Sequence, residues 1–86
     1  PVIFDITHSV QRPGGLGDRS GGEAHFIDTL GPAGVAAGVD GVFMETHEDP
    51  EHALSDGPNA YRLDRMKGFL AHLQKVHALT SARGRR

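Results

Sequence analysis

An imidazole and two carboxylates lie at or beyond the ends of two apolar, strand-like segments. His8 follows residues 2–7, and Glu45 ends residues 39–45, one strand–helix repeat later. Asp56 comes in the next loop. Side chains of these types bind divalent metals such as Zn²⁺, Mn²⁺ or Fe²⁺ when they converge. The same residues also fit ordinary hydrogen-bonded strand ends, so this pattern alone leaves metal binding as a hypothesis.

Neighbouring titratable residues leave other roles and another metal ligand open. Asp5 is either a buried carboxylate or the ion-paired end of its strand. His47 lies two residues past Glu45 and is the rival metal ligand. The remaining histidines are interpreted as surface residues without a catalytic role: His25, His52, His72 and His77.

Residues 11–22 form a loop that contains Pro13 and five of the chain's 12 glycines. Loops of this length in compact domains are usually functional or disordered. Backbone amides of glycine-rich loops can cradle phosphate. The sequence lacks the Lys-Ser or Lys-Thr of a P-loop and the third glycine of a dinucleotide fingerprint. Arg19 and Ser20 favour an anion site that orders on ligand binding over a mobile surface loop.

The elements that must position these groups alternate between strand and helix. Residues 2–7 and 39–45 are short and largely apolar, which is typical of strands covered on both faces. Residues 24–37 carry apolar side chains at helical spacing, and we expect this helix to start or kink near Pro32 and to end at Gly38. Residues 63–79 carry one apolar stripe and form the clearest helix.

This order predicts a parallel sheet with helical crossovers. The carboxyl ends of adjacent parallel strands would bring His8 and Glu45 to one rim. A helical turn is expected at residues 50–54, and residues 81–86 are expected to be a disordered basic tail. Two strands cannot shield both faces and both edges of a sheet, so we expect a fragment of a larger α/β protein.

The composition of the chain limits the classes of partner that it can bind. The formal net charge of −2 gives no electrostatic case for nucleic acid or an acidic membrane surface, and no apolar run approaches the ~20 residues of a membrane span. The chain has no cysteine and no visible signal peptide, so we expect a cytoplasmic protein without disulfides. It starts inside a strand-like segment without a methionine, which indicates a piece cut from a longer chain.

Three stretches closely resemble the late-barrel segment of 3-deoxy-D-manno-octulosonate 8-phosphate synthases, and the likeness runs in order from Pro1 to about Leu79. They are PVIFDITHSVQ with the following PGG and SGG (residues 1–22), GVDGVFMETH (38–47) and ALSDGPN (53–59). The helix between the first two departs from the family, because Gly31, Pro32 and Gly34 stand where alanine and arginine are usual.

The resemblance implies that residues 1–80 are the last two βα units, strands 7 and 8, of a TIM (β/α)8 barrel. The family condenses phosphoenolpyruvate with D-arabinose 5-phosphate, for lipopolysaccharide synthesis, in enzymes that are commonly homotetramers. In its metal-dependent members a first-strand cysteine joins a histidine, a glutamate and an aspartate, matched here by His8, Glu45 and Asp56. Other members work without metal, and Ser55 before Asp56 favours the metal-dependent branch.

The resemblance also assigns roles. His8 and Asp56 are expected to be catalytic, Gln11 to contact the sugar phosphate and Ser20 to help hold its phosphate group. Asp5 lies in the same motif and is expected to support the substrate-binding residues. The chain alone should be inactive, because the upstream lysines, arginines and cysteine are absent from it. The alternatives are the related 3-deoxy-heptulosonate 7-phosphate synthase and a non-catalytic metal- or anion-binding βαβα module.

Overall fold

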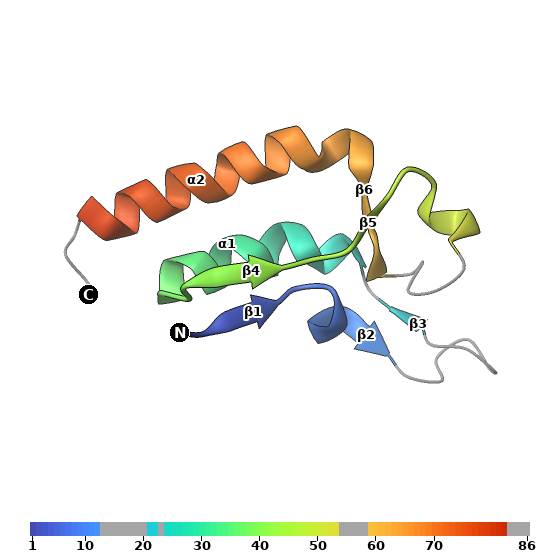
Figure 1. The fold of residues 1–86 in the computed structure, drawn as a ribbon, viewed down its shortest axis with the longest axis horizontal. Coiled ribbons are helices and arrows are strands. Elements are labelled where there is room, and N and C mark those ends of the chain that lie inside the picture. The colour runs from blue at the N-terminus through green and yellow to red at the C-terminus, as the bar shows by residue number, and fades with distance from the viewer. Residues whose placement is uncertain (13–20, 23, 54–58, 83–86) are drawn as a thin grey trace.

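The computed structural model describes residues 1–12, 21–22, 24–53 and 59–82 (Figure 1). The main elements are β1 (Ile3–Asp5), α1 (Ile27–Ala37), β4 (Gly41–Phe43) and α2 (Met66–Ala82). Shorter strands are β2 (Gln11–Arg12), β3 (Gly21–Gly22), β5 (Thr46–His47) and β6 (Tyr61–Arg62). Single 3₁₀ turns occupy His8–Val10, Ala24–Phe26, Pro50–His52 and Leu63–Arg65. The predicted order of strand, helix, strand and helix is therefore confirmed.

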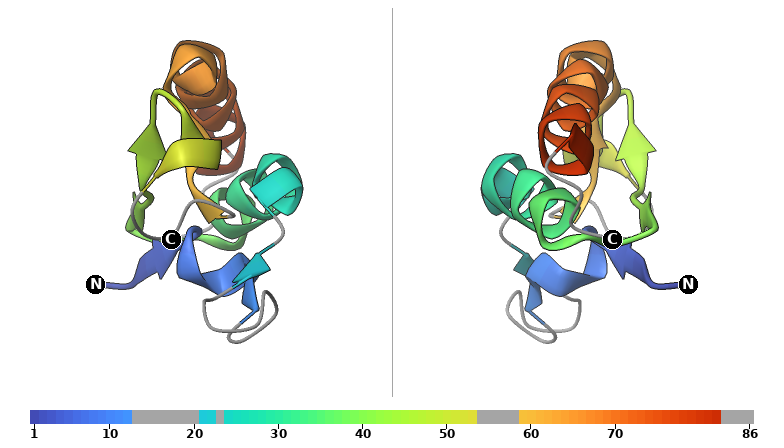
Figure 2. Two further views of the ribbon diagram at one scale, coloured as in Figure 1. Left: turned by 90° about the vertical axis from the view of Figure 1, so that its right-hand side faces the viewer. Right: turned by 90° about the vertical axis from the view of Figure 1, so that its left-hand side faces the viewer.

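β1 and β4 form a parallel pair, as predicted, although each is shorter than the apolar segment that contains it. Asp5 is the register partner of Phe43, and the Ile6 N–H extends the pairing by donating to the Phe43 carbonyl at 2.9 Å. Both α1 and α2 lie on the same side of this strand pair (Figure 2). The carboxyl ends of β1 and β4 consequently point in the same direction, as the rim hypothesis requires.

Side chains alternate along a strand, so β1 and β4 each present two faces. Phe4 and Val42 are register partners, are partly buried and pack on the core toward the helices. On the opposite face Ile3 is 60% exposed and Phe43 is 46% exposed. In the part of the chain that the structure describes, the strands are therefore covered on one face, whereas their apolar composition predicts cover on both. The buried core itself comprises Ile6, Val10, Ile27, Val35, Tyr61, Phe69 and Leu73.

Of the two alternatives for Pro32, a helix start there is wrong, because α1 begins at Ile27 and contains the proline, whereas a kink at Pro32 stays a prediction. Proline removes the N–H that would bond to the Asp28 carbonyl, at a cost of about 3 kcal/mol. Burial of Ile27 and Val35 along one helix face offsets this cost. The predicted end is confirmed: Gly38 has φ 108°, a left-handed conformation, and its N–H bonds to the Gly34 and Val35 carbonyls.

α2 confirms the predicted C-terminal helix, with a 3₁₀ turn at Leu63–Arg65 before it. It includes Ser81 and Ala82, which the sequence assigns to the tail, while residues 83–86 lie outside the described residues. Its buried Phe69 packs against α1 at Gly31, where an added Cβ would lie 2.6 Å from the Phe69 ring. Within the described ranges, no helix is long and apolar enough to cross a membrane.

The short strands were not expected from the sequence. β2 and β3 pair antiparallel, which joins the two ends of the glycine-rich segment directly after the His8 turn. β5 and β6 pair parallel, with Thr46 opposite Tyr61. The expected turn at residues 50–54 is present as the 3₁₀ turn Pro50–His52, and residue 54 lies outside the described ranges.

Candidate functional site

His8 and Glu45 meet at the carboxyl ends of β1 and β4. His8 starts the 3₁₀ turn that follows β1, and Glu45 lies two residues past β4. The His8 Nε2 and Glu45 Oε2 atoms are 3.6 Å apart, and the side chains are 38% and 36% exposed. The structure thus brings these two residues to one rim, as the strand order predicts.

Asp5 holds His8 from the other side of the ring. Its Oδ2 lies 2.8 Å from the His8 Nδ1, and its Oδ1 accepts the backbone N–H groups of Thr7 and His8 at 3.0 and 2.9 Å. Burial acts to raise the pKa of Asp5, but the hydrogen bonds from His8 and Thr7 outweigh it and leave the pKa below the ordinary 3.8. Asp5 is therefore the ionised, ion-paired strand end of the two alternatives.

This arrangement determines what His8 offers at the rim. An ionised carboxylate beside Nδ1 favours a ring proton on Nδ1, so Nε2 is the ring nitrogen that faces Glu45. Two ligands on a tetrahedral Zn²⁺ are separated by about 3.4 Å, given metal–ligand bonds of about 2.0–2.2 Å. The observed separation of 3.6 Å fits that value. The geometry of His8 and Glu45 therefore fits a shared divalent ion.

The described residues supply only part of a metal site. Among them, no group of three or more His, Cys, Asp or Glu side chains is arranged to hold an ion. Asp56, the third expected ligand, and Ser20 lie outside the described residues, as does the side chain of Gln11. The Gln11 backbone is placed and pairs with Gly22 in the β2–β3 ladder.

Four of the other histidines have local partners. The Nδ1 atom of His47, the rival ligand, accepts the Asp49 backbone N–H at 2.8 Å, which occupies one of its two ring nitrogens. His52 pairs with Asp49 at 2.6 Å in an exposed turn. The ring of His25 lies against Phe26, and His77 Nε2 lies 3.3 Å from the Ser81 hydroxyl. None of these arrangements joins the rim.

Two residues at the rim were missed from the sequence. Phe43 lies beside the His8 ring with centroids 6.4 Å apart, and its spacing of two from Glu45 was a usable signal because it places both on one strand face. Thr7 is fully buried, and its hydroxyl accepts the Glu45 backbone N–H at 2.6 Å. No sequence signal separates such a threonine from an ordinary strand residue.

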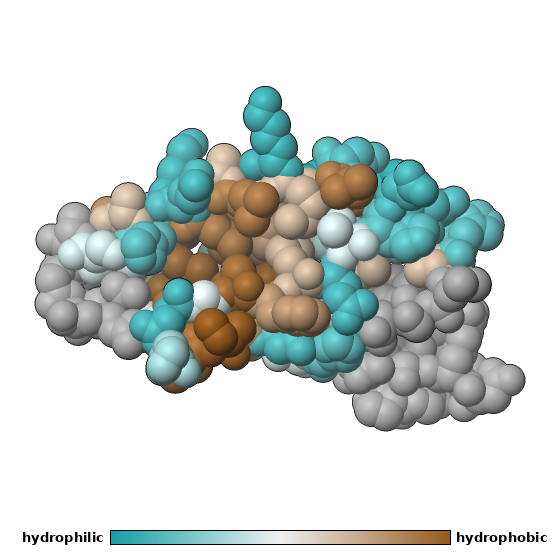
Figure 3. All heavy atoms as spheres, in the orientation of Figure 1, coloured by the Kyte–Doolittle hydropathy of each residue, from teal (hydrophilic) through white to brown (hydrophobic). Residues whose placement is uncertain are grey.

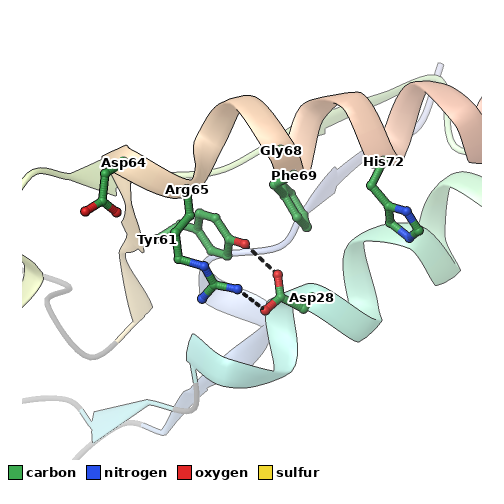
Figure 4. Close-up of a pocket in the computed structure, with 7 residues that line it drawn as sticks. All are labelled: Asp28, Tyr61, Asp64, Arg65, Gly68, Phe69 and His72. Atoms are coloured by element: carbon green, nitrogen blue, oxygen red, sulfur yellow. Dashed lines mark hydrogen bonds and ion pairs between the residues drawn. The ribbon is translucent and has the colours of Figure 1, made fainter.

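A second polar cluster joins the start of α1 to the segment that leads into α2 (Figure 4). The Tyr61 hydroxyl donates to Asp28 Oδ1 at 2.5 Å, and Arg65 donates to Asp28 Oδ2 at 2.9 Å. The Arg65 guanidinium also lies 5.1 Å from the centre of the Tyr61 ring. Burial and the bond to Asp28 raise the pKa of Tyr61 to about 12. The cluster lines a hollow of about 510 Å³, and its charges satisfy one another.

A parallel βα repeat with a histidine and a glutamate on its carboxyl rim places the chain among the α/β proteins. Comparison with known proteins gives the family. The model of the DAHP synthetase I family matches residues 1–82, and the chain belongs to this family.

Proteins named 2-dehydro-3-deoxyphosphooctonate aldolase are among its relatives. The one from Geotalea daltonii is 58% identical over 79 residues, which are 92% of this chain and 29% of the relative. The relative from Alkalilimnicola ehrlichii is 56% identical over 98% of this chain and 30% of its own length. That from Acidithiobacillus ferrooxidans is 63% identical over 88% of this chain and 27% of its own length. The chain therefore spans about 30% of the length of the curated relatives that it matches.

Proposed function

We propose that the complete protein carrying this chain is a 3-deoxy-D-manno-octulosonate 8-phosphate synthase, the enzyme also called 2-dehydro-3-deoxyphosphooctonate aldolase. The observation that carries the proposal is the meeting of His8 Nε2 and Glu45 Oε2, 3.6 Å apart, at adjacent parallel strand ends. This rim occurs in a chain whose relatives bear that name at 54–63% identity.

The reaction joins phosphoenolpyruvate to D-arabinose 5-phosphate. The C3 carbon of phosphoenolpyruvate bonds to the aldehyde carbon, water adds its oxygen to C2, and the C2–O bond breaks to release inorganic phosphate. Charge develops on the aldehyde oxygen and on the departing phosphate, so fixed groups at the rim lower the barrier. His8 presents Nε2 to this space, and Asp5 holds its ring so that little reorganisation is needed.

The proposed metal ligands are His8, Glu45 and Asp56, with Zn²⁺, Fe²⁺ or Mn²⁺ as the ion. When bound, such an ion polarises the aldehyde and orients water. The separation of His8 and Glu45 and the carboxylate behind His8 support this assignment, because histidine ligands usually donate their second ring N–H to such a group. The alternative is a metal-independent enzyme in which the same hydrogen-bonding residues orient the substrates, with His8 as a proton carrier.

Substrate contacts are proposed for the segment that follows His8. Gln11 is assigned to the sugar phosphate, Ser20 to its phosphate group and Asp5 to support of both. The β2–β3 ladder supports this proposal, because it lies beyond the carboxyl end of β1 and brings the two ends of the glycine-rich segment back to the rim (Figure 1).

The barrel assignment is supported by the uncovered face of the strand pair. We propose that β1 and β4 are strands 7 and 8 of a (β/α)8 barrel, in which further strands cover that face and its edges. Apolar residues form a continuous strip over β1, β4 and the flank of α2 (Figure 3). Large apolar residues that remain exposed include Val2, Ile3, Phe43 and Leu70. Homotetrameric assembly, a cytoplasmic location and a role in lipopolysaccharide synthesis belong to the same proposal.

The test uses a chimaera in which residues 1–82 replace the aligned segment of a full-length 2-dehydro-3-deoxyphosphooctonate aldolase with a first-strand cysteine. Phosphate release from phosphoenolpyruvate is measured with D-arabinose 5-phosphate and, separately, with D-erythrose 4-phosphate. We expect turnover with the five-carbon sugar and little with the four-carbon sugar. His8→Ala in the same chimaera serves as the inactive control.

Each of the other outcomes contradicts a different part of the proposal. Preference for D-erythrose 4-phosphate would indicate a 3-deoxy-heptulosonate 7-phosphate synthase, in line with the broader family name. Mn²⁺ binding without turnover of either sugar would indicate a metal-binding module. Full activity after exhaustive chelation would reject the metal while leaving the reaction in place.

A further inference from the structure

The β1–β4 ladder does not by itself fix the position of Glu45. The paired register ends at Asp5 and Phe43, and Glu45 lies between β4 and β5. A carboxylate that must face His8 therefore needs other constraints on its main chain. The structure supplies one on each side of the residue.

Hydrogen bonds to two buried residues hold both main-chain groups of Glu45. Its N–H donates to the Thr7 hydroxyl at 2.6 Å, and its carbonyl accepts the Tyr61 N–H at 3.0 Å. Thr46 adds a third bond, from its hydroxyl to the Tyr61 carbonyl at 2.9 Å. Thr7 is 0% exposed and Tyr61 is 4% exposed, so water has little access to these two residues if their bonds to Glu45 are lost.

Tyr61 is itself firmly held. Its hydroxyl donates to Asp28 at the start of α1, and its ring packs on Phe69 with centroids 4.8 Å apart (Figure 4). Arg65 ion-pairs with the same aspartate at 2.9 Å. The main chain that bonds to the Glu45 carbonyl is thus tied to both α1 and α2.

We propose that Thr7 and Tyr61 form a main-chain clamp that positions the Glu45 carboxylate opposite His8. Thr7 directly precedes His8, so its hydroxyl connects the main chain of one rim residue to that of the other. Tyr61 completes the clamp, because its N–H bonds to the Glu45 carbonyl. Both are positioning residues that act through Glu45, and the inference rests on the proposed function because it concerns the same rim.

The experiment compares Thr7→Val and Thr7→Ser in the chimaera defined above. Valine keeps the shape of threonine but cannot accept the Glu45 N–H, whereas serine keeps the hydroxyl. Loss of an outer partner of a metal ligand typically weakens binding by 10–100-fold. We expect the dissociation constant for Mn²⁺, measured by competition with a chelator, to rise at least about tenfold in Thr7→Val and less than about threefold in Thr7→Ser.

A core variant separates positioning from general destabilisation. Leu73→Ala removes a buried side chain of α2 and should lower the melting temperature without changing Mn²⁺ affinity. Unchanged affinity in Thr7→Val, or equal weakening in Thr7→Val, Thr7→Ser and Leu73→Ala, would overturn the clamp. A chimaera with the native sequence that neither turns over nor binds Mn²⁺ contradicts the proposed function, and the clamp is rejected with it.

Discussion

Asp5 grips His8 at two points: Oδ2 meets the ring Nδ1 at 2.8 Å, and Oδ1 accepts the His8 backbone N–H at 2.9 Å. A single carboxylate therefore fixes both the direction of the ring and the turn that carries it. Because both residues belong to one short segment, half of the rim is organised locally, before Glu45 is considered. This coupling leads to the first prediction.

Asp5→Asn should disable His8 while preserving its place. The asparagine amide can still accept the backbone N–H groups, but its NH₂ would donate to Nδ1 and move the ring proton to Nε2. Nε2 would then carry a proton and could not bind a metal ion at the rim. We expect Mn²⁺ affinity and kcat of the chimaera to fall by about 10–100-fold, measured by chelator competition and phosphate release.

Asp49→Asn is the matched control, since Asp49 pairs with His52 at the same spacing of three residues in an exposed turn. It should leave both quantities unchanged. Equal affinity of Asp5→Asn and the native sequence would show that Asp5 does not set the tautomer of His8.

Tyr61 should resist ionisation at alkaline pH. Its pKa is raised to about 12 from 10.0, so the folded state favours the neutral phenol. This contribution to stability is complete below pH 10 and is lost as the pH rises toward 12, a change of about 2–3 kcal/mol. The chain has a single tyrosine, so the ultraviolet difference spectrum between the chimaera and its Tyr61→Phe variant isolates this group.

Asp28→Asn should return the titration toward pH 10, because it removes the charge next to the phenol. Asp64→Asn should not, since Asp64 bonds to Arg62 instead. Titration near pH 10 in the folded native sequence would exclude the Tyr61–Asp28 bond.

Gly31 should tolerate no side chain. An alanine methyl there would lie 2.6 Å from the buried Phe69 ring, so the ring or the helix that carries it would have to shift. Overpacking of this kind costs about 1–3 kcal/mol, which exceeds the gain of about 1 kcal/mol for alanine over glycine in a helix. We expect Gly31→Ala to lower the melting temperature of the chimaera.

Gly68 provides the opposite case on α2, because an added Cβ meets nothing within 4 Å. Gly68→Ala should therefore raise the melting temperature through helix propensity alone. Equal effects of the two substitutions would contradict the close approach of the helices.

The 86-residue chain alone should neither turn over substrate nor melt in a sharp two-state transition. Its strand pair exposes an apolar face and two edges, and two-stranded sheets are marginal in water. Circular dichroism during heating tests this expectation. A steep cooperative melt of the monomeric chain would show that α1, α2 and the small core suffice for folding.

The rim was predictable because it depends on local apolar runs and on the strand–helix repeat. Apolar runs revealed the strands, and the single helical repeat between His8 and Glu45 placed them on neighbouring strand ends. The end of α1 was equally predictable, since glycine after a helix adopts the left-handed conformation seen at Gly38.

What escaped the sequence depends on distant partners. The bond between Tyr61 and Asp28 joins residues 33 positions apart, and the bond from Glu45 to Thr7 joins residues 38 apart. Side-chain type alone does not select such pairs. The predicted helix start near Pro32 failed for a related reason. The preference of proline for the first turn of a helix was overridden by the burial of Ile27 and Val35 on the same helix.

The register of β1 against β4 determines how the rim responds to insertions and deletions. Because strand side chains alternate, a slip of one residue would turn Met44 to the rim and Glu45 toward the helices. An insertion or deletion of one residue within β4 would thus erase the site while keeping every functional side chain in the sequence. Alignments that match residue types but shift this strand by one position would misjudge which relatives retain the rim.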